Sequence, residues 1–233
     1  MASRPDAPTI APGGTIGILG GGQLGRMTAM AGARLGYRTH IFCQGADEPA
    51  AQVAAERTLA PFSDEAALAR FARAVDVVTF EFENIPAKPL AAMVGLAPIR
   101  PSPTVLAIAQ DRLVEKEFLV GSGFSTAPFE EIEDEASLLQ ADAAIGRPSI
   151  LKTARLGYDG KGQVRLAPGA DIRAAWRDIG GGRAILEGFV DFASEASAIV
   201  ARAPDGTVAT YEPAANRHEG GILRESRVPS GLP

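Results

Sequence analysis

The sequence predicts an α/β domain followed by an α+β domain. From Thr15 onward, short β-rich runs alternate with segments whose apolar residues recur at helical spacing, which is typical of a parallel sheet covered by helices. Prolines at 98, 101 and 103 then interrupt this pattern, and a second set of helices and strands follows. Because 46% of the 233 residues are apolar, each domain can bury a core.

The first domain is predicted to span residues 15–110, behind a disordered arm at 1–14 that is rich in Pro and Gly and lacks a signal-peptide core. The expected strands are 15–19, 39–42, 77–80 and 98–100. The expected helices are 23–35 and 64–74, the second with Ser63 and Asp64 as possible caps.

The second domain begins with a helix at 111–120, closed by Gly121 and Gly123. Residues 111–190 are predicted to form an α+β subdomain with helices at 134–145 and 170–179 and strands at 149–153, 163–166 and 184–188. Residues 191–233 should add a hairpin of 194–203 and 207–211 and a strand at 222–228. No helix covers this last sheet, so we expect a C-terminal portion to be missing or supplied elsewhere.

Charge and composition narrow the possible partners. The formal net charge of -5 and the pI of about 5.2 lack the basic excess of a nucleic-acid binder, so we expect small-molecule substrates. The single cysteine, Cys43, cannot form an internal disulfide, which suits a reducing compartment. No uncharged stretch approaches the roughly 18 apolar residues of a membrane span, and a cytoplasmic location is expected.

A glycine-rich loop follows the first strand. Gly20, Gly22 and Gly25 form G-x-G-x-x-G at the start of the first helix, where backbone N–H groups and the helix dipole can hold a phosphate. Arg26 could add a charge-assisted bond. The alternative is a tight turn without a ligand.

The end of the second strand argues against a dinucleotide. An NAD enzyme usually places an acidic residue there to bind the ribose hydroxyls, but the sequence has Cys43 and Gln44, and Asp47 comes late. A simpler phosphate ester is therefore the better candidate ligand for this loop.

Residues 81–86 read Glu-Phe-Glu-Asn-Ile-Pro just after a buried strand. They fall at the carboxyl edge of the sheet, where ligands of open α/β folds bind, and two acids and an amide suggest polar recognition. A cap formed by Asn84 ahead of Pro86 is an equally good interpretation.

A second glycine-rich loop follows Lys152, which is predicted to lie on a strand. Residues 152–163 are not a Walker A loop, because Gly162 stands where that motif has Ser or Thr. A hairpin that closes over a polyphosphate with its backbone N–H groups, while Lys152 reaches it from below, fits better. An exposed hairpin with ordinary turn glycines is the alternative.

Five segments together resemble the 5-(carboxyamino)imidazole ribonucleotide synthetase family of ATP-grasp ligases. They are residues 20–27, 81–86, 111–116, 157–163 and 216–224, in this order and spacing. The resemblance covers nearly all of the chain after the arm. It implies a Rossmann-like N-terminal domain and an ATP-grasp domain that is incomplete at its C-terminus.

The resemblance also implies roles for individual residues on the ATP side. Arg112 and Lys152 would contact the phosphates, Glu195 would bind the ribose hydroxyls, and His218 would lie in the nucleotide site. The adenine would be lined by Glu187, Gly188, Phe189 and Val190. The loop over the phosphates would consist of Gly157, Tyr158, Asp159, Gly160, Lys161, Gly162 and Gln163. Without the resemblance, the two glutamates are solvated strand-end acids and the histidine is a surface residue.

On the side of the second substrate, the resemblance implies that Tyr158, Asp159 and Lys161 help to hold aminoimidazole ribonucleotide and the reactive intermediate. The first glycine-rich loop and residues 81–86 would also bind this ribonucleotide. The residues implied are Gly20, Gly22, Gln23, Leu24, Gly25 and Glu83.

The implied reaction is ATP-dependent carboxylation of the ribonucleotide amine by bicarbonate, through carboxyphosphate and without biotin. Mg²⁺ is expected, but with ligands beyond Pro233, so we assign no metal ligands in this sequence. Residues 1–233 alone should bind nucleotide weakly and turn over poorly. A homodimer is carried over from the family. Three alternatives remain: a formate-dependent glycinamide ribonucleotide formyltransferase of the same fold, an NAD-dependent oxidoreductase, and a nucleotide-binding module without catalysis.

Overall fold

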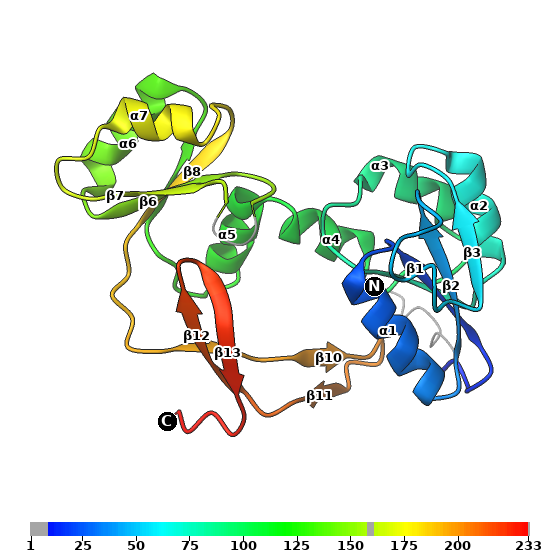
Figure 1. The fold of residues 1–233 in the computed structure, drawn as a ribbon. Helices are drawn as coiled ribbons and strands as arrows, with labels where there is room; N and C mark the ends of the chain where they lie inside the picture. The colour runs from blue at the N-terminus through cyan, green and yellow to red at the C-terminus, as the bar shows by residue number, and fades with distance from the viewer. Residues whose placement is uncertain (1–8, 158–160, 233) are drawn as a thin grey trace. The chain divides into compact units, whose positions relative to one another are not determined.

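The computed structural model describes residues 9–157 and 161–232, with only the backbone of 87 and 88. The chain divides into two compact units, Met1–Gln110 and Asp111–Pro233, which we describe separately (Figure 1). No helix in the described part is long and apolar enough to cross a membrane.

Unit 1 is built on a four-stranded parallel sheet with the order β3-β2-β1-β4. Its strands are β1 (Thr15–Leu19), β2 (Arg38–Cys43), β3 (Glu56–Leu59) and β4 (Val77–Phe80). Its helices are α1 (Gln23–Arg34), α2 (Glu65–Arg73), α3 (Ala87–Leu90), the 3-10 helix η1 (Ala91–Met93) and α4 (Pro103–Ala109).

Helices cover both faces of this sheet, because successive strand residues point to opposite sides. Ile18 and Ile41 pack with Ala29 of α1 in one core cluster. Their chain neighbours Leu19 and Phe42 pack in another cluster with α2 and η1. The sheet is therefore doubly wound, and parallel β1 and β4 end side by side, which brings residues 20–25 next to residues 81–86.

The elements of unit 1 differ from the sequence prediction in several places, and the short helices α3 and η1 were not predicted. The predicted strand 98–100 makes only a single parallel bridge, between Ile99 and Val78. The polar strand β3 was missed because its pairing with β2, not its own pattern, stabilises it. A helix was also missed in the proline-rich stretch: α4 begins with Pro103 in its first turn and Ser102 as its N-cap.

Unit 2 contains a four-stranded antiparallel sheet with the order β5-β8-β6-β7. Its strands are β5 (Phe129–Ile132), β6 (Ser149–Thr153), β7 (Gln163–Leu166) and β8 (Ala184–Gly188), and its helices are α5 (Arg112–Gly121), α6 (Glu135–Ile145) and α7 (Ile172–Asp178). Helices α6 and α7 share one core cluster with the strands. Leu113 of α5 packs with Ile185 and Ala154 in a separate cluster.

The last part of unit 2 is antiparallel: β12 (Ala214–Glu219) pairs with β9 (Glu195–Ser197) and β13 (Ile222–Arg227), and β10 (Val200–Arg202) pairs with β11 (Val208–Thr210). The predicted hairpin exists, but its first strand, 194–203, is split. Residues 195–197 pair with β12 instead of β11, so the two halves belong to different sheets. Strand β12 and the short strand β5 were missed, because their sequences lack an apolar alternation.

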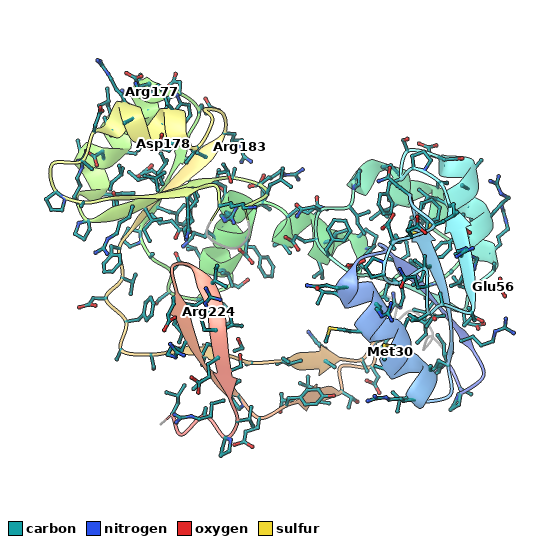
Figure 2. The ribbon with its side chains drawn as sticks, in the orientation of Figure 1. Met30, Glu56, Arg177, Asp178, Arg183 and Arg224 are labelled. Carbon is teal, nitrogen blue, oxygen red and sulfur yellow. The ribbon has the colours of Figure 1, made fainter. Side chains whose placement is uncertain are left out.

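His40 of β2 is a buried titratable group in unit 1, with a side chain 7% exposed. Its Nε2 lies 2.8 Å from the Thr58 hydroxyl, and its Nδ1 has no hydrogen-bond partner among the described residues. Glu56, at the start of β3 (Figure 2), comes within 3.9 Å of Nδ1. Burial lowers the pKa of His40, and the opposing effect of Glu56 is smaller.

We therefore expect the free energy of unfolding of unit 1 to fall as the pH drops below about 6.5, because unfolded His40 then takes up a proton that the folded side chain resists. The loss should level off below the folded pKa. The change of the free energy of unfolding with pH can be measured by urea unfolding above and below about pH 6.5. The amide NMR signals of β1 and β2 report the unfolding of unit 1. His40→Gln should remove this contribution and His218→Gln should keep it; equal slopes in both variants would contradict it.

Candidate active site

The glycine loop of unit 1 already holds an internal anion. Gly22 donates its N–H to Glu81 Oε2 at 2.6 Å. A Cβ at Gly22 would lie 2.1 Å from Glu81 Oε1, and a Cβ at Gly20 would lie 2.6 Å from Oε2. The glycines therefore admit the Glu81 carboxylate to the N-terminus of α1, the position where the sequence predicts a phosphate.

Other polar side chains around this loop are also engaged. Arg26 donates to Gln52 Oε1 at 2.9 Å and to the carbonyl of Pro49, so it fastens the following loop and does not extend a phosphate site. After β2, Glu48 accepts the N–H groups of Gln44 and Gly45 at 2.9 and 2.6 Å. The Glu48 carboxylate therefore caps its own turn. This arrangement does not favour the binding of a dinucleotide.

Residues 81–86 border a small, mainly apolar cavity of about 230 Å³. It is lined by Phe80, Glu81, Phe82, Glu83, Pro101, Val105, Leu106 and Ala109. Asn84 donates to the Glu83 carboxylate at 3.1 Å. Gln110 donates to the carbonyls of Glu83 and Ile85 and so fixes the backbone of this segment. Gln23 and Leu24 are exposed on the first turn of α1.

In unit 2, Lys152 of β6 points at Glu187 of β8, a neighbour in the sheet. Lys152 Nζ lies 2.8 Å from Glu187 Oε2, and Lys116 Nζ of α5 lies 3.4 Å from Oε1. All three side chains are at least three-quarters buried. Sequence reasoning missed Lys116, although it follows Arg112 by four residues and so faces the same side of its helix.

Arg112 holds the base of the second glycine loop. Its guanidinium donates to the carbonyls of Thr153, Leu156 and Gly157 at 2.8, 2.6 and 3.0 Å. Its own N–H donates to the Ala154 carbonyl at 2.9 Å. The residue predicted to contact phosphates thus also positions the loop predicted to close over them.

Asp111 is the N-cap of α5, the helix that begins with Arg112. Its Oδ1 caps α5 by accepting from Leu113 and Val114, and its Oδ2 accepts from Arg183 and Arg155. Burial tends to raise the pKa of Asp111, but these hydrogen bonds and the charge of Arg183 outweigh it and hold that pKa below its usual value. Arg183 precedes β8 (Figure 2) and also bonds to Glu131 of β5 at 2.6 Å.

Two loop glycines make close approaches that a side chain would obstruct. Gly157 and Gly162 have positive φ, and a Cβ at Gly162 would lie 2.8 Å from Thr153 Oγ1. Thr153 donates its N–H to the Gly162 carbonyl, and Gln163 pairs with Lys152 in the ladder. Tyr158, Asp159 and Gly160 lie outside the described residues.

The segment after β8 keeps one backbone donor available. Gly188 and Phe189 donate their N–H groups to Pro128 and Pro148 at 2.8 and 3.1 Å. Among the described residues, none accepts from the N–H of Val190. Arg165 of β7 stacks on the Phe189 ring, 4.4 Å from its centroid, and Val190 is half-exposed. The segment thus presents the Val190 N–H beside the apolar side chains of Phe189 and Val190.

Glu195 and His218, which the sequence places 23 residues apart, are in direct contact. His218 Nδ1 lies 2.9 Å from Glu195 Oε2, because β9 and β12 are paired. Both side chains are about one-third exposed. The structure thus brings two predicted nucleotide residues together.

Family models match both parts of the chain. Residues 14–110 match the ribonucleotide synthetase preATP-grasp domain, and residues 117–233 match the ATP-grasp domain. The second match covers half of the chain.

Individual relatives are similar along almost the whole chain. An N5-carboxyaminoimidazole ribonucleotide synthase of Brucella melitensis is 49% identical over 97% of this chain and 63% of its own length. The structure of an N5-carboxyaminoimidazole synthetase from Staphylococcus aureus with ADP has a TM-score of 0.90 at 33% identity, covering 96% of this chain and 60% of that one.

A third relative, an N5-carboxyaminoimidazole synthase of Aspergillus clavatus in complex with ADP and 5-aminoimidazole ribonucleotide, has a TM-score of 0.81 at 26% identity. It covers 91% of this chain and 56% of that one. The chain therefore spans about 60% of the length of these relatives.

Proposed function

The chain belongs to the ATP-grasp family, and from this we propose that it carries the nucleotide site of a ligase that carboxylates 5-aminoimidazole ribonucleotide with bicarbonate and ATP. ADP, phosphate and N5-carboxyaminoimidazole ribonucleotide are the products. The similarity to synthases of that name and to a complex with ADP and the ribonucleotide supports this choice of substrate.

The observation that carries the proposal is the group of cations around the second glycine loop. Lys152 and Lys116 share one carboxylate, and the backbone of that loop is held by Arg112. Two lysines on one carboxylate, with Arg112 at the base of the loop, suit a polyphosphate. Transfer of a phosphoryl group depends on positioning and charge neutralisation more than on covalent help.

The adenosine part of ATP fits the segment after β8. In our proposal the Val190 N–H donates to the adenine edge, and the half-exposed Phe189 and Val190 form the apolar walls. Glu195 accepts from the ribose hydroxyls, and His218 orients it through their contact.

The proposed chemistry has two steps. A bicarbonate oxygen attacks the γ-phosphorus of ATP and the bond to ADP breaks, which gives carboxyphosphate. The amine of the ribonucleotide then takes the carboxyl group and loses a proton while phosphate leaves. Lys152 and Arg112 neutralise the charge that shifts onto ADP, and the loop at 157–163 keeps water from the intermediate.

We assign the glycine loop of unit 1 to recognition of the ribonucleotide. For Tyr158, Asp159 and Lys161 of unit 2, the same role is proposed from the resemblance alone. Because Glu81 fills the N-terminus of α1, we propose that the exposed Gln23 and Leu24, with Glu83, recognise the ribonucleotide there. Gly20, Gly22 and Gly25 then act by admitting Glu81.

Further features of the whole protein belong to the same proposal: Mg²⁺ with ATP, a cytoplasmic location and a homodimer. Mg²⁺ would neutralise part of the phosphate charge of ATP. No group of three His, Cys, Asp or Glu side chains in residues 9–157 and 161–232 could hold a metal ion. We therefore assign Mg²⁺ no ligand among these described residues.

The test is phosphate release from ATP by a protein that extends this chain to the length of its relatives. We expect release that requires both 5-aminoimidazole ribonucleotide and bicarbonate. Release that requires glycinamide ribonucleotide and formate would assign the chain to the formyltransferase. Nucleotide binding without release under either condition would indicate a module without catalysis.

A further inference from the structure

Glu187 shares its carboxylate between two lysines from different elements. Lys152 of β6 takes Oε2 at 2.8 Å, and Lys116 of α5 takes Oε1 at 3.4 Å. The side chains of Glu187, Lys116 and Lys152 are 10%, 15% and 23% exposed. At this burial their charges are screened only weakly by solvent.

Lys116 is held in this position by its surroundings. It lies on α5, whose N-terminus is fixed by Asp111, and its ammonium lies 5.7 Å from the centroid of the Phe129 ring. Phe129 belongs to β5, which pairs with β8 opposite Glu187. The contact with Glu187 therefore follows from the packing of α5 against the sheet.

The charges of the three groups sum to one positive unit. In the proposed site, Lys152 would direct part of its charge and hydrogen bonding from Glu187 toward an entering nucleotide phosphate. If Lys152 were the sole partner, Glu187 would be left as a buried, uncompensated anion beside a polyanion, which is strongly unfavourable. With Lys116 on the other oxygen, Glu187 stays neutralised.

We propose that Lys116 is a positioning residue that balances the charge of Glu187 and thereby frees Lys152 to bind the nucleotide phosphates. This inference rests on the nucleotide site proposed above. It assigns to α5 a role in phosphate affinity that is separate from the contacts of Arg112 with the loop.

The test compares two ligands with one variant. Lys116→Met should raise the Kd for ATP about tenfold, which corresponds to about 1.4 kcal/mol, and should leave the Kd for adenosine unchanged. Adenosine has no phosphate, so a variant that had merely lost its packing would bind both ligands less well. Calorimetry with ATP and an NMR titration with adenosine give the two constants.

Further variants separate the charge of Lys116 from its other contacts. Lys116→Arg keeps the charge and should retain ATP affinity. Arg173→Met removes the cation of an exposed pair with Glu135 and should change neither constant. In the background of Glu187→Gln there is no anion to balance, so adding Lys116→Met should cost much less than in the wild type.

If Lys116→Met lost equal affinity for ATP and adenosine, or kept an unchanged Kd for ATP, the role of Lys116 would be overturned. The proposed nucleotide site would not be affected by either result. A wild-type chain that binds neither ligand would contradict the nucleotide site itself, and the inference with it.

Discussion

Asp111→Ala is expected to lower the free energy of unfolding of unit 2 by about 3 kcal/mol. The loss of an N-cap costs about 1 kcal/mol, and hydrogen bonds to a charged group contribute about 1.5–3 kcal/mol. Asp111 makes both kinds of contact, and its own side chain is only 6% exposed. Arg183, which is 45% exposed, can be rehydrated, so the loss should stay below that of a fully buried pair.

Urea unfolding followed by the fluorescence of Trp176 measures this effect, because the single tryptophan packs against the core of unit 2. Asp171→Ala is the matched control: Asp171 caps α7 through two backbone N–H groups but lies on the surface. It should cost about 1 kcal/mol. Equal losses in the two variants would show that the pairs of Asp111 with arginine contribute nothing.

The pKa of Asp111 gives this difference a pH dependence. Because the folded pKa lies below the unfolded one, the stabilisation is fully present above about pH 4 and is lost as the pH falls through the folded pKa. The difference in the free energy of unfolding between the wild type and Asp111→Ala should therefore become smaller at acidic pH.

Lys152→Met is expected to weaken ATP binding about 10- to 100-fold, the equivalent of a charged hydrogen bond of about 1.5–3 kcal/mol. The variant also leaves Glu187 with Lys116 alone, so the cluster loses its positive charge. Calorimetry with ATP measures the loss. Arg173→Met should bind like the wild type, and a Lys152→Met variant that also binds like the wild type would remove Lys152 from the phosphate site.

The strongly patterned elements could be predicted from sequence. Strands β1, β4, β6, β7 and β8 match the predicted ranges, because each joins a β-rich pattern to a clear glycine or polar boundary. The strands β3 and β12 could not be predicted, since their polar residues form strands only through pairing with neighbours.

The candidate site was predictable as a set of residues but not as a set of contacts. Sequence placed Glu81 and the first glycine loop at the same edge, yet only the fold shows that the carboxylate enters the loop. Likewise, Lys116 lay in a recognised motif, but its partner Glu187 is 71 residues away, and such pairing depends on tertiary packing.

The most direct test of where the nucleotide binds is hydrogen–deuterium exchange of this chain with and without MgATP. We expect slower exchange in peptides covering residues 112–116, 150–163 and 185–190 of unit 2, with little change at residues 20–27. Slower exchange confined to residues 20–27 would instead place the nucleotide on the glycine loop of unit 1 and contradict the assignment of the ATP site to unit 2.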